Sequence, residues 1–296
     1  ARWRHRRELL WRSVEIGERL EFRFEHLKPT LPSFPVPARF EDDDAFLAYL
    51  SWEGAQVRYG NDLGEKHRRQ IQHELDVIRR HGMAGYFLIT WDISRFCRDR
   101  GILAQGRGSA ANSAVCYCLR ITAVDPIGME LLFERFLSEG RRDYPDIDID
   151  ISHKWREEVI QYVYARYGRL HAALVCEQIR YRTRSAVRDA AWAMGFEQRQ
   201  IEHLAASVGR HAADAEAIRA SLSGDGRVRS SVHPDDPRLP VLASLVTSLE
   251  GIPRHRSIHV GGMVLTKHPL CEIVPIEPAS MPERTIIQWE KDDLPY

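Results

Sequence analysis

Three aspartates alternate with isoleucines in residues 146–151, as Asp146-Ile147-Asp148-Ile149-Asp150-Ile151. Because successive side chains of a strand point to opposite faces, this spacing predicts a strand with carboxylates on one face and branched apolar side chains on the other. Crowded carboxylates repel one another, and a divalent cation relieves that repulsion. Ligand sets made only of oxygen suit Mg²⁺, Mn²⁺ or Ca²⁺. The pattern therefore predicts a metal-binding strand.

Two other interpretations of this segment remain open. Asp146, Asp148, Asp150 and Glu157 have the acidic spacing of an EF-hand calcium loop, but Ile151 stands where that loop needs a glycine for its sharp turn. The segment could also be a solvated acidic edge without a metal. The strict isoleucine alternation favours a strand that packs on a core.

A glycine-rich segment, residues 106–113, lies between a predicted strand at 102–104 and a predicted helix at 110–119. Gly108 allows close approach of a ligand to the backbone, a helix N-terminus offers free N–H groups, and Ser109 adds a hydroxyl. Arg107 could pair with phosphate oxygens through its planar guanidinium group. The segment lacks the Gly-Lys-Ser/Thr of a Walker A loop. It predicts phosphate binding, with a purely structural turn as the alternative.

Basic residues elsewhere suggest further contacts with a substrate. Arg135 precedes the acidic strand in an apolar run, and we interpret it as a clamp on a triphosphate; the alternative is a surface arginine whose stem covers apolar neighbours. Four arginines follow at short spacing, and a helix would place three of them on one face, suited to a nucleic-acid backbone or to a solvated ion-paired surface. They are Arg180, Arg182, Arg184 and Arg188.

The remaining pattern describes the elements that must position these residues. Periodic apolar positions predict helices at 5–20, 65–80 and 86–100, another capped by Asp43 or Asp44, and an almost wholly helical stretch from 155 to 250. Strand patterns return at 262–266 and 285–289. His259, in the polar segment before the first of these, is predicted only to lie near the site.

Composition excludes some classes of protein and leaves others open. The chain has 296 residues, equal numbers of acidic and basic residues, and no apolar run long enough to span a membrane. Its five cysteines show no paired zinc-binding spacing, and Cys116 and Cys118 are predicted to be core residues. These features indicate a cytoplasmic protein of one large or two smaller domains.

Taken together, three motifs resemble those of the bacterial C-family DNA polymerase III alpha subunit. They lie at 106–113, 132–137 (Leu-Phe-Glu-Arg-Phe-Leu) and 145–150 (Pro-Asp-Ile-Asp-Ile-Asp). His259-Val260-Gly261-Gly262 and the residues 288–293 (Gln-Trp-Glu-Lys-Asp-Asp) extend the resemblance. The sequence at 179–182 and 283–294 is closer to that of the error-prone, damage-inducible paralogue than to that of the main replicase.

The resemblance implies an α+β fold: a nucleotidyltransferase-like palm with a mixed β-sheet, interrupted by a helical thumb. Residues 1–59 would connect a missing N-terminal PHP domain to the palm, 60–177 and 252–296 would form the palm, and 178–251 the thumb. It also implies that a third catalytic aspartate and the fingers domain lie beyond Tyr296. We therefore expect a palm–thumb fragment that is inactive by itself.

The resemblance assigns roles to single residues. Asp146 and Asp148 match the catalytic, metal-binding aspartates, with Asp150 in support, and Gly108, Ser109 and Arg135 match positions that hold the triphosphate. The implied reaction is template-directed DNA synthesis with two Mg²⁺ ions, for which Mn²⁺ could substitute.

The implied partners are primer–template DNA and a dNTP, with no membrane. A sliding clamp and damage-tolerance accessory proteins would bind through regions outside this chain, and the protein would be associated with the nucleoid. The alternatives are a metal-dependent nucleotidyltransferase acting on a small substrate, and a non-catalytic DNA-binding module.

Overall fold

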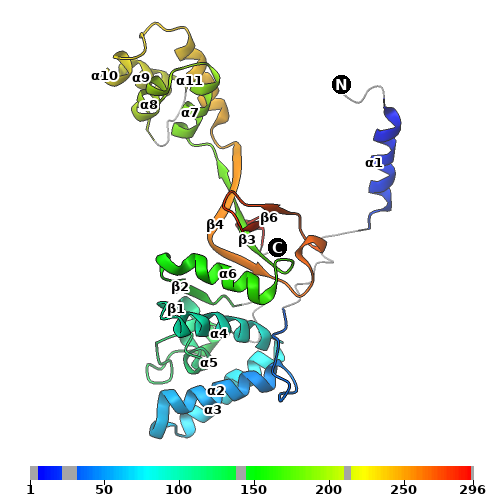
Figure 1. Ribbon diagram of the computed structural model, residues 1–296. Helices are drawn as coiled ribbons and strands as arrows, with labels where there is room; N and C mark the ends of the chain where they lie inside the picture. The colour runs from blue at the N-terminus through cyan, green and yellow to red at the C-terminus, as the bar shows by residue number, and fades with distance from the viewer. Residues whose placement is uncertain (1–5, 22–31, 138–144, 210–214, 295–296) are drawn as a thin grey trace. The chain divides into compact units, whose positions relative to one another are not determined.

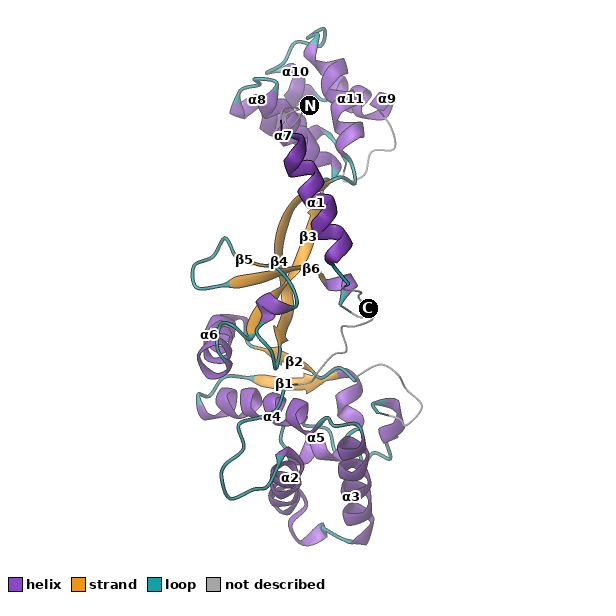
Figure 2. Cartoon of the chain, turned by 90° about the vertical axis from the view of Figure 1, so that its right-hand side faces the viewer, coloured by secondary structure: helices purple, strands orange, loops and turns teal. Residues whose placement is uncertain are grey.

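The computed structural model describes residues 6–21, 32–137, 145–209 and 215–294 (Figure 1). The chain divides into two compact units. Unit 1 comprises residues 1–173 and 263–276, and unit 2 comprises residues 174–262 and 277–296. Each unit contains helices and strands, which confirms a mixed α/β fold (Figure 2). No helix in these described parts is both long and apolar enough to cross a membrane.

Unit 1 is mostly helical. Its helices are α1 (Arg7–Arg19), α2 (Asp43–Tyr59), α3 (Glu65–Arg80), α4 (Ala84–Asp99), α5 (Ala114–Cys118) and α6 (Arg156–Tyr167). The predictions at 5–20, 65–80 and 86–100 are confirmed to within two residues. The cap of α2 is corrected by one position, because Asp42 accepts the hydrogen bond from the amide of Ala45 at 2.8 Å.

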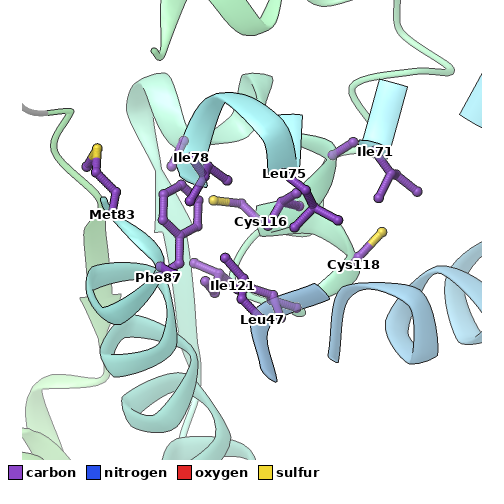
Figure 3. Close-up of a cluster of buried hydrophobic side chains, with 14 of the residues drawn as sticks. Leu47, Ile71, Leu75, Ile78, Met83, Phe87, Cys116, Cys118 and Ile121 are labelled. Carbon is purple, nitrogen blue, oxygen red and sulfur yellow. The ribbon is translucent and has the colours of Figure 1, made fainter. Parts of the chain in front are cut away.

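The core of unit 1 forms where α2, α3, α4 and α5 meet (Figure 3). Leu47, Ile78 and Phe87 come from three of these helices, and all are buried. Cys116 and Cys118 of α5 are buried among them as free thiols, which confirms their predicted place in the core. Burial raises the pKa of the Cys118 thiol to about 12, so this thiol stays protonated at neutral pH.

The acidic segment forms a strand, as predicted. β2 (Asp148–Ile151) pairs antiparallel with β1 (Ala104–Arg107), and Arg107 lies opposite Asp148. Ile147 packs on the main core and Ile151 on a smaller cluster around Val159 of α6, whereas Asp146 and Asp150 are exposed. The alternation thus places isoleucines against apolar clusters and these carboxylates toward solvent.

Two local predictions around β1 are wrong. The strand lies at 104–107 rather than 102–104, because its register with β2 extends into the segment expected to be a loop. The expected helix at 110–119 is instead a 3-10 segment, Gly108–Asn112, followed by the short α5. Ser113 separates them: its backbone is extended, and its hydroxyl caps α5 by accepting from the amide of Cys116 at 3.1 Å.

A four-stranded sheet has the order β4-β3-β6-β5. Its strands are β3 (Ala172–Arg180), β4 (Pro253–Leu265), β5 (Ile276–Pro278) and β6 (Thr285–Glu290). β3 and β6 are parallel, with Leu174 opposite Ile286. β3 contradicts the prediction of an almost wholly helical stretch from 155 to 250. Its first five residues are all buried, and a continuous apolar run of this kind also fits a buried strand.

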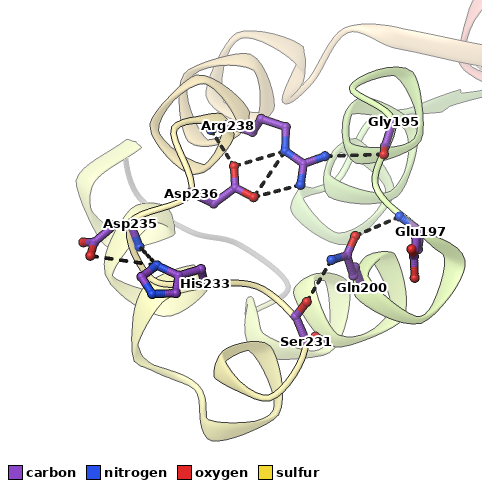
Figure 4. Close-up of polar contacts among 8 residues, drawn as sticks. All are labelled: Gly195, Glu197, Gln200, Ser231, His233, Asp235, Asp236 and Arg238. Carbon is purple, nitrogen blue, oxygen red and sulfur yellow. Dashed lines mark hydrogen bonds and ion pairs between the residues drawn. The ribbon is translucent and has the colours of Figure 1, made fainter.

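The helices of unit 2 have an apolar core of their own. They are α7 (Thr183–Ala193), α8 (Gln198–Ser207), α9 (Ala215–Gly224), α10 (Gly226–Arg229) and α11 (Arg238–Leu249). Val187, Leu204 and Leu242 represent its fully buried side chains. Polar contacts join the connecting segments at its surface: Gln200 donates to the carbonyl of Ser231, and Arg238 binds Asp236 (Figure 4).

Candidate metal and nucleotide site

The carboxylate row of β2 faces an arginine of the neighbouring strand. The Arg107 guanidinium lies 3.0 Å from Asp148 Oδ2 and 3.0 Å from Asp150 Oδ1. Both carboxylates raise the pKa of Arg107, with the hydrogen bond to Asp150 as the largest cause. The two aspartates therefore point to the same side of the strand, and that side attracts a cation. Arg107, predicted to bind phosphate, contacts the acidic strand instead.

The glycine-rich segment lies directly beside the start of the acidic strand. Gly108 has a φ of +68°, a left-handed conformation that favours glycine, and it turns the chain from β1 into the 3-10 segment. Ser109 Oγ lies 3.5 Å from the carbonyl oxygen of Asp146. Asn112 Nδ2 donates to the carbonyl of Ser109 at 2.9 Å and stabilises the turn. The structure thus brings Ser109 and Asp146 together.

One part of the predicted phosphate site is wrong. We expected free amides at the start of the helix after the loop, but those of α5 are already bonded. The amides of Ala114 and Val115 each donate to the carboxylate of Glu74 at 3.0 Å, and that of Cys116 donates to Ser113. The first amides of the 3-10 segment have no partner inside that segment, and they are the candidates to bind a ligand.

Arg135 is positioned by a short 3-10 segment, Phe133–Arg135, that lies against the Gly108–Asn112 segment. Phe133 and Phe136 are buried in the core and anchor the turn, while Arg135 is exposed between them. The structure therefore brings the predicted clamp and the predicted phosphate loop to neighbouring places in unit 1.

Sequence reasoning missed two residues that support this region. Glu74 of α3 is fully buried and binds the start of α5; its only signal was an acidic residue within the apolar positions Ile71, Leu75 and Ile78. The hydroxyl of Tyr86 accepts from the amide of Ile147 at 2.8 Å and holds the start of the acidic strand. Burial is the main cause that raises the pKa of Tyr86, to about 12.

The donor set of the acidic strand fits a magnesium-like ion in part. Within the described residues, no group of three or more acidic, histidine or cysteine side chains is arranged to hold a metal. Mg²⁺ is commonly bound by only one or two carboxylates, completed by waters and substrate phosphates. Asp146 and Asp148 supply two carboxylates beside a phosphate-loop candidate, and Asp148 is paired with the guanidinium of Arg107.

The four arginines predicted to bind a nucleic-acid backbone do not share one helix. α7 begins at Thr183, so Arg180 ends strand β3 and Arg182 is the residue before the helix. Arg184 and Arg188 are one turn apart on the exposed side of α7. Arg180 and Arg184 donate to the carbonyls of Gly251 and Val208, respectively. All four lie in unit 2, and the prediction of a single helical face is wrong.

His259 lies on β4 in unit 2 and is half-buried. Its Nδ1 atom is buried and has no hydrogen-bond partner among the described residues. A Cβ atom at Gly262 would lie 2.9 Å from this nitrogen and 2.8 Å from the Val175 side chain. The glycine is therefore needed for the imidazole to pack where it does.

Comparison with known proteins places the chain in a family. The profile described as the bacterial DNA polymerase III alpha NTPase domain matches residues 45–296. The chain belongs to this family. Over most of its own length the chain is also similar to proteins named error-prone DNA polymerase.

Three relatives show the extent of the similarity. The error-prone DNA polymerase of Anaeromyxobacter dehalogenans (strain 2CP-C) is 52% identical over 84% of this chain and 22% of that protein. That of Methylococcus capsulatus is 47% identical over 97% of this chain and 27% of that protein. That of Mycobacterium tuberculosis (strain H37Rv) is 45% identical over 97% of this chain and 24% of that protein. This DNA polymerase III alpha family chain thus spans about a quarter of these relatives.

Proposed function

We propose that this chain is the palm and thumb region of an error-prone DNA polymerase that adds deoxynucleotides to a primer 3′-hydroxyl on a DNA template. The observation that carries the proposal is the pairing of β1 with β2, which places the phosphate-loop candidate beside the acidic strand, with Ser109 Oγ 3.5 Å from the main-chain carbonyl oxygen of Asp146. Carboxylates for a metal and a loop for phosphate are the parts that nucleotidyl transfer requires. Family membership and the relatives' names support the same activity.

In this proposal, residues 60–177 and 252–296 form a nucleotidyltransferase-like palm, 178–251 the thumb, and 1–59 a connector. Asp146 and Asp148 hold the divalent ions, with Asp150 in support through the shared contact with Arg107. Bound Mg²⁺ would increase the acidity of the primer hydroxyl and neutralise charge on the leaving pyrophosphate.

The chain's own groups orient the nucleotide. The amides of Gly108 and Ser109 and the exposed Arg135 guanidinium donate to the triphosphate oxygens, where charge develops in the transition state. Arg107 has to exchange its contacts with Asp148 and Asp150 for phosphate oxygens before it can contribute. Arg180, Arg182, Arg184 and Arg188 contact the DNA backbone without reading sequence, and His259 supports the fold near its glycine pair. The polymerase acts in the cytoplasm, where it is associated with the nucleoid.

The decisive experiment is primer extension by the complete protein that contains this chain, with Asp148→Asn. We expect turnover to fall at least about a hundredfold, whereas the affinity for primer–template DNA stays nearly unchanged. Asp99→Asn, an exposed aspartate at the end of α4, is the matched control and should extend normally. Comparable extension by both variants would refute the metal assignment.

Two further measurements separate the alternatives. An enzyme that acts on a small substrate would keep its activity when Arg182 and Arg188 are neutralised. A non-catalytic DNA-binding module would show nearly the same affinity for divalent ions after Asp146→Asn or Asp148→Asn.

A further inference from the structure

A buried carboxylate fixes the segment that follows β1. Glu74 of α3 has no solvent exposure, and each of its two oxygens accepts two hydrogen bonds. Oε1 accepts from Gln70 and the amide of Ala114, both at 3.0 Å. Oε2 accepts from the Ser113 hydroxyl at 2.8 Å and the amide of Val115 at 3.0 Å. Three of the four donors belong to the segment 113–115.

This arrangement exceeds what a five-residue helix needs. Ser113 already caps α5 by itself, through the amide of Cys116. Burial raises the pKa of Glu74, and the four hydrogen bonds oppose that rise. An apolar residue at this core position would avoid the cost of burying a carboxylate. We therefore attribute to the carboxylate a role in fixing the position of residues 113–115 rather than in stabilising the core.

A continuous set of contacts runs from Glu74 to the acidic strand. Ser113 binds Glu74 and donates its amide to Ala110 at 3.1 Å, Asn112 binds Ser109, and Ser109 Oγ lies near the Asp146 carbonyl. A cavity of about 560 Å³, lined by Gln70, His73 and Asn112 among others, adjoins the segment. It leaves room for the segment to shift when its anchor is removed.

We propose that Glu74 is a positioning residue for nucleotide binding: it holds the Gly108–Ser113 segment so that the amides of Gly108 and Ser109 face the triphosphate. This inference rests on the proposed function. The carboxylate never touches the nucleotide, and acts through Ser113 and the turn that Asn112 closes.

The test is steady-state incorporation by the complete protein with Glu74→Gln. In glutamine an NH2 group replaces one of the two carboxylate oxygens. This group cannot accept the two hydrogen bonds that the oxygen accepted, so both are lost. We expect KM for the dNTP to rise about tenfold or more with a smaller fall in kcat, because the displaced amides contact the triphosphate in the ground state as well as in the transition state. The Kd for primer–template DNA should stay the same.

Ile71→Val is the matched control, since Ile71 is fully buried on the same face of α3 one turn earlier. It should lower Tm without raising KM. An equal rise in KM for both variants would overturn the inference and leave Glu74 a purely structural residue.

Ser113→Ala provides a second variant, which decides the matter if Glu74→Gln does not fold. It removes one donor to Glu74 and also the cap that the hydroxyl accepts from the Cys116 amide. We expect a rise in KM of a fewfold, and an unchanged KM would overturn the inference. The proposed function fails separately, through normal turnover of Asp148→Asn.

Discussion

The two units differ in where they place their charged groups. Unit 1 buries two carboxylates, Glu74 and Asp92, both without solvent exposure. Among its described residues, unit 2 buries no carboxylate, and its ion pairs are partly exposed. Asp189 and Arg254 have side-chain exposures of 37% and 34%, and Asp236 and Arg238 have 14% and 37%.

This difference indicates two ways of stabilising a fold. A buried carboxylate with several donors tolerates few alternative arrangements, because any lost partner leaves a desolvated charge. Exposed pairs contribute little and tolerate change. Unit 1, with the candidate metal and phosphate groups, thus adds buried polar networks with fixed atomic positions to its apolar core, whereas the ion pairs of unit 2 lie at least partly exposed around its core.

The largest expected effect is the loss of the second buried carboxylate. Asp92 of α4 accepts from Arg95 at 2.8 Å and from the hydroxyls of Tyr162 and Tyr167 at 2.7 and 3.0 Å, and Arg166 lies 3.5 Å away. Asp92→Ala leaves these groups unpaired between α4 and α6. We expect unit 1 to lose about 3–5 kcal/mol. Hydrogen exchange of the α4 and α6 amides measures this loss.

Asp99→Ala, on the same helix but exposed, should leave the same amides protected. Because Asp92 lies in unit 1, hydrogen exchange of the amides in α7–α11 of unit 2 should stay unchanged in Asp92→Ala. Equal exchange of α4 and α6 in the two variants would mean that the buried network does not stabilise unit 1.

The sequence predicted those parts of the fold and site that depend on local periodicity. The period of two in residues 146–151 predicted the acidic strand, and the period of 3.6 predicted α3 to the residue. The phosphate loop and the triphosphate clamp were predicted from residue types and spacing and then matched by the family resemblance, and the structure places the Arg135 turn against that loop.

Predictions failed where a tertiary contact decides the outcome. The four-residue arginine spacing suggested one helix, but a strand buried from Ala172 onward extends to Arg180. The amides of α5 were expected to be free, yet Glu74 reaches them from about forty residues away in sequence. The apolar run of β3 and the acidic residue among the apolar positions of α3 were local signals, but neither indicates its distant partner, so sequence periodicity could not reveal the pairing of β3 with β6 or the contact of Glu74 with α5.

A smaller effect is expected for the matching contact in unit 2. Asp236 accepts from the amide and the guanidinium of Arg238 at the start of α11. Asp236→Ala removes the hydrogen bond to the first amide of α11 and the ion pair, and we expect the free energy of unfolding to fall by about 1–2 kcal/mol, seen as faster hydrogen exchange in α11. Asp235→Ala, at an exposed neighbouring position, is the control and should have no measurable effect.

The pH dependence of this loss follows from the Asp236 carboxyl. The hydrogen bond from Arg238 lowers the pKa of Asp236 below its ordinary value of 3.8. A lowered pKa in the folded state means that the contribution is present above pH 3.8 and is lost as the pH falls through the lower folded value. The difference between wild type and Asp236→Ala should therefore narrow below pH 3.8. A constant difference down to lower pH would assign the effect to packing instead.

The smallest effect on the fold, and the sharpest test of how unit 2 is used, is expected for Arg188→Ala. Arg188 is exposed on α7, so hydrogen exchange in both units should stay unchanged. Affinity for primer–template DNA should fall equally for all sequences, and the slope of log K against log salt should decrease by about 1, the value for one phosphate contact. Arg199→Ala, an exposed arginine of α8, serves as the control. Equal slopes for these two variants and the wild type would show that Arg188 belongs to a solvated surface, and that contact with DNA must be sought on another face of unit 2.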